Sequence, residues 1–475
     1  MAVPRILVLF PGTAALAMGI PLVMAAVLGE KEMLGAFGIP MAAVIVPALL
    51  AVFLTRKQPL LPGVPDGFFF VFLAWLLTSF FGALPYRLSG AVSFCDAFFE
   101  SACGFATTGA TTIAGVEALP RSLLLWRSLT CWLGGMGIVL LSVALMPAPG
   151  IGGFRLLKAE TPGSDKRSAA PRIRAAVKLL CSLYCGLTAV LVLLYRAGGM
   201  SWFDAVCHGL AVISSGGAST RNGGIASYHS PFIEVITVIF MLLAGINFSL
   251  YCGLFRGKWK DLLVNTECRA YLLVFVLAAG ALSLSLVPVY GGDALRYGSF
   301  QAASVLSTTG YAIANYDNWP EFSRALIFCL MLTGGCSLST AGGIKVIRHV
   351  ILFKQAGNEL RKLIYSGGIF SVRLNRKVGR MDIVYGTAAF VFLYFLVAAV
   401  TGLVAAASGT DVFSAFSAAL AVTGNTGTGF GKAGPSGNYG AFPDHVKWLF
   451  SFVTIAGRLE LWTVFILFTP EYWRR

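Results

Sequence analysis

Four short stretches that combine glycine with hydroxyl or amide side chains recur along the chain, and their residue types suit the binding of a dehydrated cation. The four are Thr107-Thr108-Gly109-Ala110-Thr111, Ser215-Gly216-Gly217-Ala218-Ser219, Thr308-Thr309-Gly310-Tyr311-Ala312 and Asn425-Thr426-Gly427-Thr428-Gly429. Backbone carbonyls of a pore-lining loop can replace the hydration shell of an ion. One copy alone is a weak signal, so the inference depends on the four copies together.

The central glycine of each stretch meets a conformational requirement. Alternate residues of a pore-lining loop must turn their carbonyls inward with φ above zero, and residues with a Cβ atom resist that conformation. No stretch contains a carboxylate, which favours a monovalent cation over a divalent one. The expected ion ligands are Thr108, Gly109, Gly216, Gly217, Thr309, Gly310, Thr426 and Gly427, and the first residues of the filter are Thr107, Ser215, Thr308 and Asn425.

The composition assigns the chain to the membrane. Hydrophobic residues make up 57% of the 475 residues, charged residues make up 12%, and the mean hydropathy is +0.78. A soluble domain has about 45–50% apolar and about 25% charged residues. Apolar runs of about 20 residues, long enough to cross a bilayer, recur from end to end. We therefore predict an all-α polytopic membrane protein with about ten transmembrane helices and no separate soluble domain.

Apolar segments of two lengths must position the four stretches. We predict an N-terminal two-helix hairpin (1–58) followed by four membrane–pore-loop–membrane repeats (59–150, 151–260, 261–365 and 366–475). The short segments before the stretches are Ser93–Phe105, Trp202–Ile213, Ala294–Leu306 and Val412–Val422. The spans are Leu7–Leu28, Met33–Leu54, Gly67–Leu84, Ser122–Met146, Ala175–Tyr195, Phe232–Phe255, Ala270–Val289, one that starts near Phe322, Ile383–Ala407 and His445–Phe468.

An aspartate near the start of each short segment is expected to cap its helix. These residues are Asp96, Asp204, Asp293 and Asp411. The central glycine follows the aspartate by 13 residues in the first two repeats, and by 17 and 16 residues in the last two. This spacing indicates a repeat that has drifted, and four unrelated re-entrant loops are the alternative.

Lysine and arginine concentrate in three linkers. Gly152–Lys178 carries seven of them against two acids, Arg256–Arg269 four against two, and Lys345–Arg380 nine against one. By the positive-inside rule, these linkers and both termini are cytoplasmic and the glycine-centred stretches face outward. The net charge of +15 then reflects topology and contact with anionic membrane lipids, and we expect no nucleic-acid partner.

Glycine interrupts the last span of the third repeat at Gly334, Gly335, Gly342 and Gly343, and Lys345 closes the interruption. Glycine and serine at this density break or hinge a helix. The segment is either a flexible gate below the four stretches or a kink that only helps packing. Lys345 either snorkels to the interface or pairs with an acid.

Three polar residues within apolar segments each allow a functional and a structural interpretation. Arg458 lies inside the span His445–Phe468, where an unpaired Arg costs about 3 kcal/mol. It is either a fixed charge in the pore that opposes cations, or a partner of a carbonyl or of Glu460, which lies two residues on and points away. Asn247 either forms an interhelical hydrogen bond or binds a cation. Glu100 is a candidate source of negative potential near the outer mouth.

These segments resemble the Trk/Ktr/HKT superfamily of potassium transporters, and most of all its bacterial Trk-type membrane subunit. The matching segments are GFATTGATT from Gly104, SSGGAST from Ser214, STTGYAIANYDNWP from Ser307, GGCSLSTAGGIKVIR from Gly334, TGNTGTGFG from Thr423 and GRLELWTVFILFTPEYW from Gly457. Together they cover all four repeats, and a leading hairpin is a feature of the Trk-type branch.

The resemblance implies a pseudo-fourfold arrangement of the repeats, a homodimer and a cytoplasmic Trk-type ring of nucleotide-binding regulatory subunits. It implies K+ as the transported ion, because glycine at all four loop centres accompanies potassium preference in this family, and it implies no organic cofactor in this chain. Two features depart from the family pattern. Leu338 and Ala341 add bulk to a loop that is usually rich in glycine, which bears on gating. Thr428 replaces a usual proline, which bears on filter geometry.

The leading functional hypothesis is potassium uptake across the bacterial cytoplasmic membrane, gated by the broken helix and the buried arginine. The alternative is a sodium- or proton-coupled secondary transporter with alternating access. Such transporters often contain inverted repeats, whereas these four units all run the same way. An enzyme is not expected, because the sequence contains no HExxH, no GxSxG and no convergent His/Asp pair.

Overall fold

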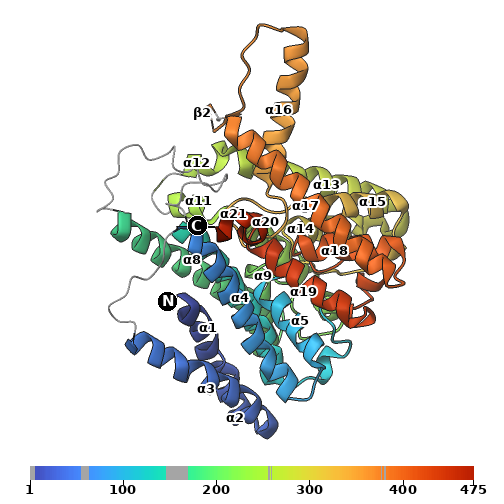
Figure 1. Ribbon diagram of the computed structural model, residues 1–475. Helices are drawn as coiled ribbons and strands as arrows, with labels where there is room; N and C mark the ends of the chain where they lie inside the picture. The colour runs from blue at the N-terminus through green and yellow to red at the C-terminus, as the bar shows by residue number, and fades with distance from the viewer. Residues whose placement is uncertain are drawn as a thin grey trace.

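The predicted all-α class is confirmed by a computed structural model that describes residues 6–54, 64–145, 169–254, 257, 259–375, 377–378 and 381–474. Helices form the whole body of the molecule (Figure 1). Within these described ranges, the strands are β1 (Arg373–Leu374) and β2 (Lys377–Val378), which pair antiparallel. Residues 152–168 of the first basic linker, Arg256 and Lys258 of the second, and Arg376, Gly379 and Arg380 of the third lie outside the described residues.

The N-terminal hairpin packs along one edge of the molecule, against the first repeat (Figure 1). It consists of α1 (Ile6–Ala17), α2 (Gly19–Leu28) and α3 (Lys31–Leu54), so the predicted first span is divided at Met18. Between α2 and α3, the Glu30 carboxylate accepts the backbone N–H of Arg121 at 2.9 Å. This bond ties the turn of the hairpin to the start of the second long helix in repeat 1.

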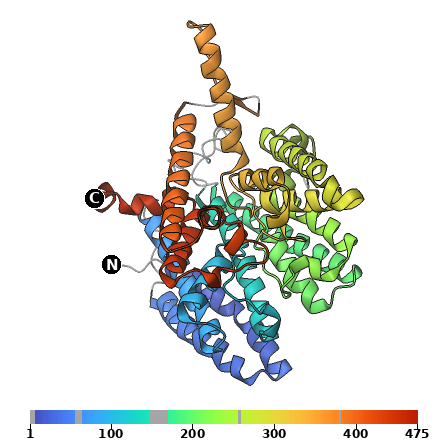
Figure 2. The same cartoon turned by 90° about the vertical axis from the view of Figure 1, so that its right-hand side faces the viewer.

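Each repeat contains a long helix, a short helix, a non-helical loop and a second long or broken helix. Repeat 1 has α4 (Val64–Leu88), α5 (Phe94–Phe105), η1 (Val116–Ala118) and α6 (Arg121–Leu145). Repeat 2 has α8 (Ala169–Ala197), α9 (Trp202–Ile213), η3 (Gly224–Tyr228), α10 (Pro231–Gly245), α11 (Phe248–Leu254) and α12 (Trp259–Val264). In Figure 2 the repeats follow one another around the centre, from blue through green and yellow to orange and red.

The last two repeats have the same order of elements. Repeat 3 has α13 (Thr266–Tyr290), η4 (Gly291–Asp293), α14 (Ala294–Leu306), η5 (Tyr316–Asn318), α15 (Glu321–Leu330) and α16 (Val346–Ile364). Repeat 4 has α17 (Met381–Ala407), α18 (Val412–Thr423), η6 (Gly431–Ala433), η7 (Tyr439–Ala441), α19 (Asp444–Arg458), α20 (Leu461–Phe465), η8 (Ile466–Phe468) and α21 (Pro470–Trp473). The exact boundaries between the repeats stay a prediction.

The caps of the short helices differ from the prediction. In α5 and α9 the N-cap is a serine, Ser93 or Ser201, whose hydroxyl accepts the N–H of the aspartate three residues later. Asp411 does cap α18, whereas Asp293 stands at the N-cap of α14 and its side chain makes no capping bond to the helix backbone. Counted from the N-cap, the central glycine follows after 16, 16, 17 and 16 residues. The repeat has therefore drifted less than the aspartate spacing indicated.

Three of the four second helices are broken, although only the break in repeat 3 was predicted. The predicted spans Phe232–Phe255 and His445–Phe468 are each two helices, bent by 95° and 113°. At the first break, Asn247 Oδ1 accepts the Ser249 N–H (2.9 Å) and caps α11, a local bond that was not predicted from the sequence. At the second break, Glu460 has φ of 60°, which ends the helix.

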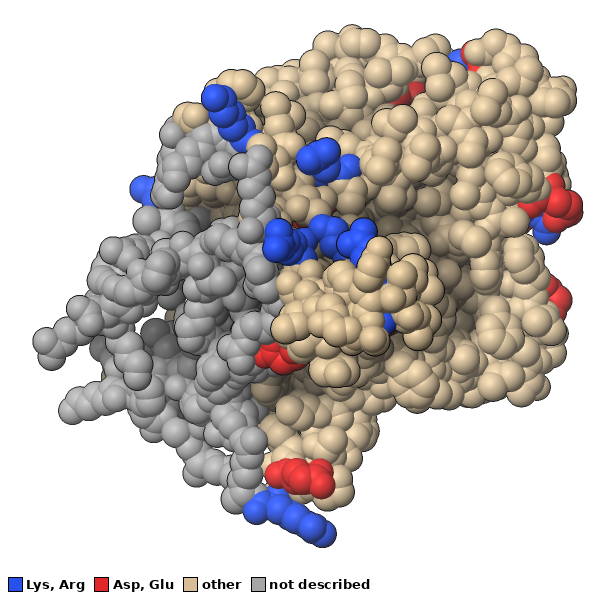
Figure 3. Space-filling view, turned by 90° about the horizontal axis from the view of Figure 1, so that it is seen from above, with Lys and Arg blue, Asp and Glu red and all other residues tan. Residues whose placement is uncertain are grey.

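The described residues contain seven helical spans long and apolar enough to cross a membrane, or up to nine when each bent pair counts as one span. The remaining predicted span, from Phe322, is helical only to Leu330, and the chain becomes helical again at Val346 as α16. Helix α16 projects from the body in both ribbon views (Figures 1 and 2). Lys and Arg side chains gather on the face from which it projects, the side predicted to be cytoplasmic (Figure 3).

Candidate functional site

Each short helix ends in one turn that also begins its loop. In α5, the Thr107 N–H donates to the Gly104 carbonyl (2.9 Å) and the Thr108 N–H to the Cys103 carbonyl (2.8 Å). This is the Schellman pattern, which places its next-to-last residue in the left-handed conformation. The bond to the residue five positions earlier recurs from the N–H of Gly216 to the Ala211 carbonyl (2.8 Å), from Thr309 to Ser304 (2.9 Å) and from Thr426 to Ala421 (2.8 Å).

Left-handed residues alternate with ordinary ones along each loop. The central glycines Gly109, Gly217, Gly310 and Gly427 have φ of 74°, 61°, 79° and 80°, as predicted. The first filter residues Thr107, Ser215, Thr308 and Asn425 are also left-handed, with φ of 53° to 55°, which was not predicted. A left-handed residue costs about 1–2 kcal/mol when it has a side chain, so the Schellman turn must hold these residues in place. The alternation aligns successive carbonyl oxygens along one side of the loop.

The four loops meet in a closed ring. A Cβ atom on each central glycine would lie closer than 3.0 Å to a backbone oxygen of the next repeat, and the fourth repeat closes on the first. The contacts are Gly109 with the Gly216 oxygen, Gly217 with the Thr309 oxygen, Gly310 with the Thr426 oxygen and Gly427 with the Thr108 oxygen. All eight predicted ligands therefore lie in one ring, and any side chain at a central position would push a carbonyl aside.

The ring stands at the C-terminal ends of four helices. Helices α5, α9, α14 and α18 each end within three residues of the ring. The C-terminal end of a helix carries about half a negative charge in its unpaired carbonyls. The arrangement can therefore attract a cation without an ionised side chain in any of the four loops.

At each of the four boundaries between neighbouring repeats, a hydrogen bond to a loop carbonyl crosses from one repeat to the next, just beyond the ring. These boundary bonds run from Arg127 Nη1 to the Ser219 carbonyl (3.1 Å), from the Tyr311 hydroxyl to the Ala218 carbonyl (2.5 Å), from the Tyr316 hydroxyl to the Gly429 carbonyl (2.6 Å) and from the Tyr439 N–H to the Thr111 carbonyl (2.8 Å). Next to Tyr316, the Asp317 carboxylate accepts the Gly431 N–H (3.2 Å), and burial raises the pKa of this carboxyl. Each bond fixes the direction of a carbonyl that follows a central glycine.

Asn425 joins repeat 4 to repeat 1 below the ring. Its Nδ2 donates to the Thr108 hydroxyl (3.0 Å) and to the Thr454 carbonyl (2.9 Å) of α19. The Thr108 and Thr454 hydroxyls also bond to each other. Asparagine tolerates the left-handed conformation better than threonine. Asn425 can therefore adopt the positive φ of this position and also donate the hydrogen bonds to Thr108 and Thr454.

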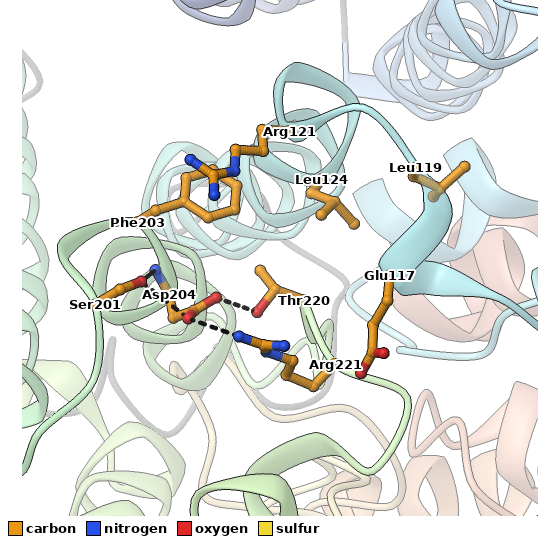
Figure 4. Close-up of a pocket in the computed structure, with 9 residues that line it drawn as sticks. All are labelled: Glu117, Leu119, Arg121, Leu124, Ser201, Phe203, Asp204, Thr220 and Arg221. Atoms are coloured by element: carbon orange, nitrogen blue, oxygen red, sulfur yellow. Dashed lines mark hydrogen bonds and ion pairs between the residues drawn. The ribbon is translucent and has the colours of Figure 1, made fainter. Parts of the chain in front are cut away.

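Asp204 secures the segment that leaves the second loop (Figure 4). Its carboxylate accepts the Thr220 hydroxyl (2.6 Å) and lies 3.8 Å from the Arg221 guanidinium. These residues, together with Glu117 and Arg121 of repeat 1, line a cavity of about 320 Å³ beyond the ring. Asp204 lies in the first turn of α9 and also stabilises the segment that follows the second loop.

The non-helical segment between α15 and α16 folds back on itself beneath the ring. The Gly334 N–H donates to the Ile344 carbonyl (2.9 Å), which closes the segment as a hairpin. The Thr340 hydroxyl bonds to the Ser215 hydroxyl (2.9 Å), and the Gly342 N–H donates to the Thr308 hydroxyl (2.7 Å). We call residues 331–345 the intramembrane loop. It contacts the first filter residues of repeats 2 and 3 directly.

Glycine residues allow the intramembrane loop to pack closely against the filter loop of repeat 4. A Cβ atom on Gly342 would overlap the Gly424 carbonyl oxygen and lie 2.8 Å from the Asn425 Cβ. Gly343 has φ of 65°, and a Cβ atom on it would lie 3.2 Å from the Gly334 Cα. The predicted glycines Gly334, Gly342 and Gly343 are thus needed for the turn and for contact with repeat 4. Gly335 packs against the Gly245 carbonyl at the break after α10.

Arg458, at the end of α19, contacts the intramembrane loop. It is buried, and its Nη1 donates to the Thr340 carbonyl at 2.7 Å, so the carbonyl is its partner. Glu460 instead pairs with Arg348 of α16 (2.5 Å). Lys345 donates to the Ala341 carbonyl of its own loop, where we expected an acid or the interface as its partner. Within the described residues, Arg458 Nε and Nη2 have no partner.

Several residues that support the loops were not predicted from the sequence. Arg127 lies in the apolar helix α6 and pairs with Glu100 of α5. An ionisable residue inside a membrane helix is itself a signal of function, and this signal was available in the sequence. Tyr311 and Tyr316 carried no such signal, because nothing in a tyrosine's spacing identifies the carbonyl that it will bond.

A family model and several curated proteins match most of this chain. The family model described as "TrkH: Cation transport protein" matches residues 36–475. The Trk system potassium uptake protein TrkH of Halomonas elongata is 37% identical over 425 residues, which cover 86% of each chain. The Trk system potassium uptake protein TrkI of the same organism is 35% identical over 469 residues, which cover 97% of this chain and 94% of that protein.

A solved structure matches the whole fold. The crystal structure of the potassium transporter TrkH from Vibrio parahaemolyticus superimposes with a TM-score of 0.90 at 31% sequence identity, and covers 99% of this chain and 98% of that one. The relatives and the membrane-spanning helices together make this a multi-pass protein of the bacterial cell membrane. The chain belongs to the TrkH family of cation transport proteins.

Proposed function

We propose that this protein takes up K+ across the cytoplasmic membrane through the ring formed by its four glycine-centred loops. The observation that carries the proposal is the closed ring, in which each central glycine faces a carbonyl oxygen of the next repeat. The curated relatives are named potassium uptake proteins, which supports K+ as the transported ion. The ion is cargo, and the proposal requires no organic cofactor.

The ring would select K+ through its backbone oxygens. The expected ligands are the carbonyl groups of Thr108, Gly109, Gly216, Gly217, Thr309, Gly310, Thr426 and Gly427. These oxygens replace the hydration shell of the ion, and the four helix ends supply negative potential. A ring without carboxylates binds a divalent cation poorly, because calcium and magnesium favour charged oxygen ligands.

The intramembrane loop is the proposed gate. It bonds to the first filter residues of two repeats, so an ion that leaves the ring inward meets it at once. Arg458 holds the loop through the Thr340 carbonyl and adds a fixed positive charge on the same path. Opening then requires the loop to leave these contacts.

Replacing Gly342 with alanine is expected to raise the K+ flux of the isolated protein severalfold. The new Cβ would overlap the Gly424 carbonyl, so the closed position of the intramembrane loop loses stability relative to the open one. The measurement is K+ or Rb+ flux into vesicles that contain the purified variant. Gly357→Ala in α16 is the matched control, because nothing lies within 4 Å of its Cβ position, and its flux should not change.

We propose a homodimer and a cytoplasmic ring of nucleotide-binding regulatory subunits as partners. The relatives are named as components of a Trk system, which supports a multi-component assembly. Helix α16 projects from the body on the predicted cytoplasmic side, where Lys and Arg gather (Figure 3). Anionic lipid headgroups would contact this basic face.

The experiment that tests the function is K+ flux into reconstituted vesicles, with and without the regulatory subunits. We expect flux down the K+ gradient in the absence of a sodium or proton gradient, and faster flux when the partner is added. Flux that requires one of those gradients would support the coupled secondary transporter instead. Absence of K+ flux under every condition would contradict both.

A further inference from the structure

We propose that the ion pair between Glu100 and Arg127 positions the loops of repeats 1 and 2 and thereby sets the preference of the ring for K+ over Na+. Both are positioning residues, since neither reaches the ring itself. The proposal rests on the function proposed above, and its test separates the two. Nothing in the comparisons assigns a role to this pair.

Arg127 contacts both loops with a single guanidinium. Its Nε lies 3.4 Å from Glu100 Oε2, and the exposed fractions of the two side chains are 7% and 3%. Its Nη1 donates to the Ser219 carbonyl of repeat 2 (3.1 Å), and its Nη2 donates to the Thr111 hydroxyl of repeat 1 (3.2 Å). The planar group therefore holds two loops at a fixed separation.

Glu100 completes the support from the short helix α5. Its Oε1 accepts the Thr111 hydroxyl and the Thr112 N–H, both at 2.6 Å. Thr111 comes two residues after Gly109, and Ser219 comes two residues after Gly217. Both residues of the pair also line a cavity of about 10 Å³ together with Gly109, so the pair lies directly behind the ring.

This arrangement is specific to the boundary between repeats 1 and 2. The residues nine positions before the four central glycines are Glu100, His208, Gln301 and Ala418. His208 makes a neutral contact with the Ser219 hydroxyl (3.0 Å), and within the described residues Gln301 Nε2 has no partner. The other three boundary bonds come from two tyrosine hydroxyls and one backbone N–H. Only the first of the four boundary bonds has an ionised donor.

The ionised bond has a physical consequence for the ring. Charge-assisted hydrogen bonds are roughly twice as strong as neutral ones, and they keep their direction. Loss of either partner leaves the other charge buried and unpaired, so the surrounding backbone must rearrange. Thr111 and the Ser219 carbonyl would then be free to turn, and the oxygens beside Gly109 and Gly217 could contract around the smaller Na+. Glu100 therefore does not act as a free negative charge at the mouth.

The test compares Glu100→Gln and Arg127→Gln in vesicles that report K+ and Na+ flux separately. Both variants should lower the K+/Na+ flux ratio about tenfold, as expected for loss of one charge-assisted bond. Asp96→Asn is the matched control, because the Asp96–Lys447 pair (2.6 Å, with 20% and 6% of the side chains exposed) is partly buried and does not bond to any of the four loops. This control should lower the thermal melting temperature and leave the flux ratio unchanged.

The two variants distinguish positioning from simple electrostatics. Glu100→Gln leaves a positive charge behind the ring and Arg127→Gln leaves a negative one, so an effect of charge alone would change the ratio in opposite directions. Opposite changes, or an unchanged ratio in folded protein, would overturn the proposal. Where either variant fails to fold, Arg127→Lys is measured in its place, because lysine keeps the charge but lacks the planar guanidinium that bonds to both loops. An unchanged flux ratio in Arg127→Lys would also overturn the proposal. Gly109→Ser in the same assay tests the ring itself and so separates failure of the pair from failure of the filter.

Discussion

Replacing Gly109 with serine is expected to let Na+ pass and to lower the K+/Na+ flux ratio by about tenfold or more. The backbone at this position has φ of 74°, where a residue with a side chain costs about 1–2 kcal/mol. The added Cβ would also lie 2.7 Å from the Gly216 carbonyl oxygen. The oxygen must move away from the ring, and a ring with one displaced ligand fits K+ less well. The measurement is the rate of Na+ and K+ entry into vesicles that contain the purified variant.

Gly115→Ser is the control for this variant. Gly115 follows the same loop, its φ is −113°, and nothing lies within 4 Å of its Cβ position. Its flux ratio should match that of the unmodified protein. If serine at Gly109, Gly217, Gly310 and Gly427 in turn left selectivity unchanged in folded protein, the ring would not be the selective element.

Replacing Arg458 with alanine is expected to raise K+ flux about tenfold in the absence of any partner. The Arg458 guanidinium donates to the Thr340 carbonyl (2.7 Å), and a hydrogen bond from a charged group contributes about 1.5–3 kcal/mol. Its loss shifts the intramembrane loop toward the open position, and removal of the positive charge lowers the barrier to cations. Both effects act in the same direction. The measurement is initial Rb+ uptake at equal amounts of reconstituted protein.

One further variant separates the effect of the hydrogen bond from that of the charge, and a second variant is a control. Arg458→Gln removes the charge but can keep a donor near the Thr340 carbonyl, so it should raise flux less than alanine if the bond dominates. Arg324→Ala removes an arginine whose partner, Glu321, is exposed, and should leave flux unchanged. A loss of flux in folded Arg458→Ala would show that this residue only supports the structure.

The sequence was sufficient to predict the class of fold, the short helices and the four loops. Alternating φ at the central glycines followed from the requirement for inward carbonyls, because glycine is the residue that accepts φ above zero without strain. The short helices were found because their apolar segments are too short to cross a bilayer. The helix caps were wrong by three residues in α5 and α9, because a serine that precedes an aspartate at this spacing makes the better cap there.

Other features depend on contacts that a single sequence does not contain. The bends at Asn247 and Glu460 interrupt apolar runs that read as continuous spans, since hydropathy averages over the one or two residues that break a helix. The partner of Lys345 is a carbonyl of its own loop, and burial in protein replaced both the acid and the interface that we expected. The boundary bonds join residues 92 or more positions apart in the sequence, so only the assembled fold identifies them.

The most direct test of the central claim is the position of ions in crystals grown with Rb+ or Tl+, located by anomalous scattering. The account predicts peaks on the common axis of the four loops, within coordination distance of the carbonyl oxygens of Thr108, Gly216, Thr309 and Thr426. Peaks at other places, with none on that axis, would contradict it.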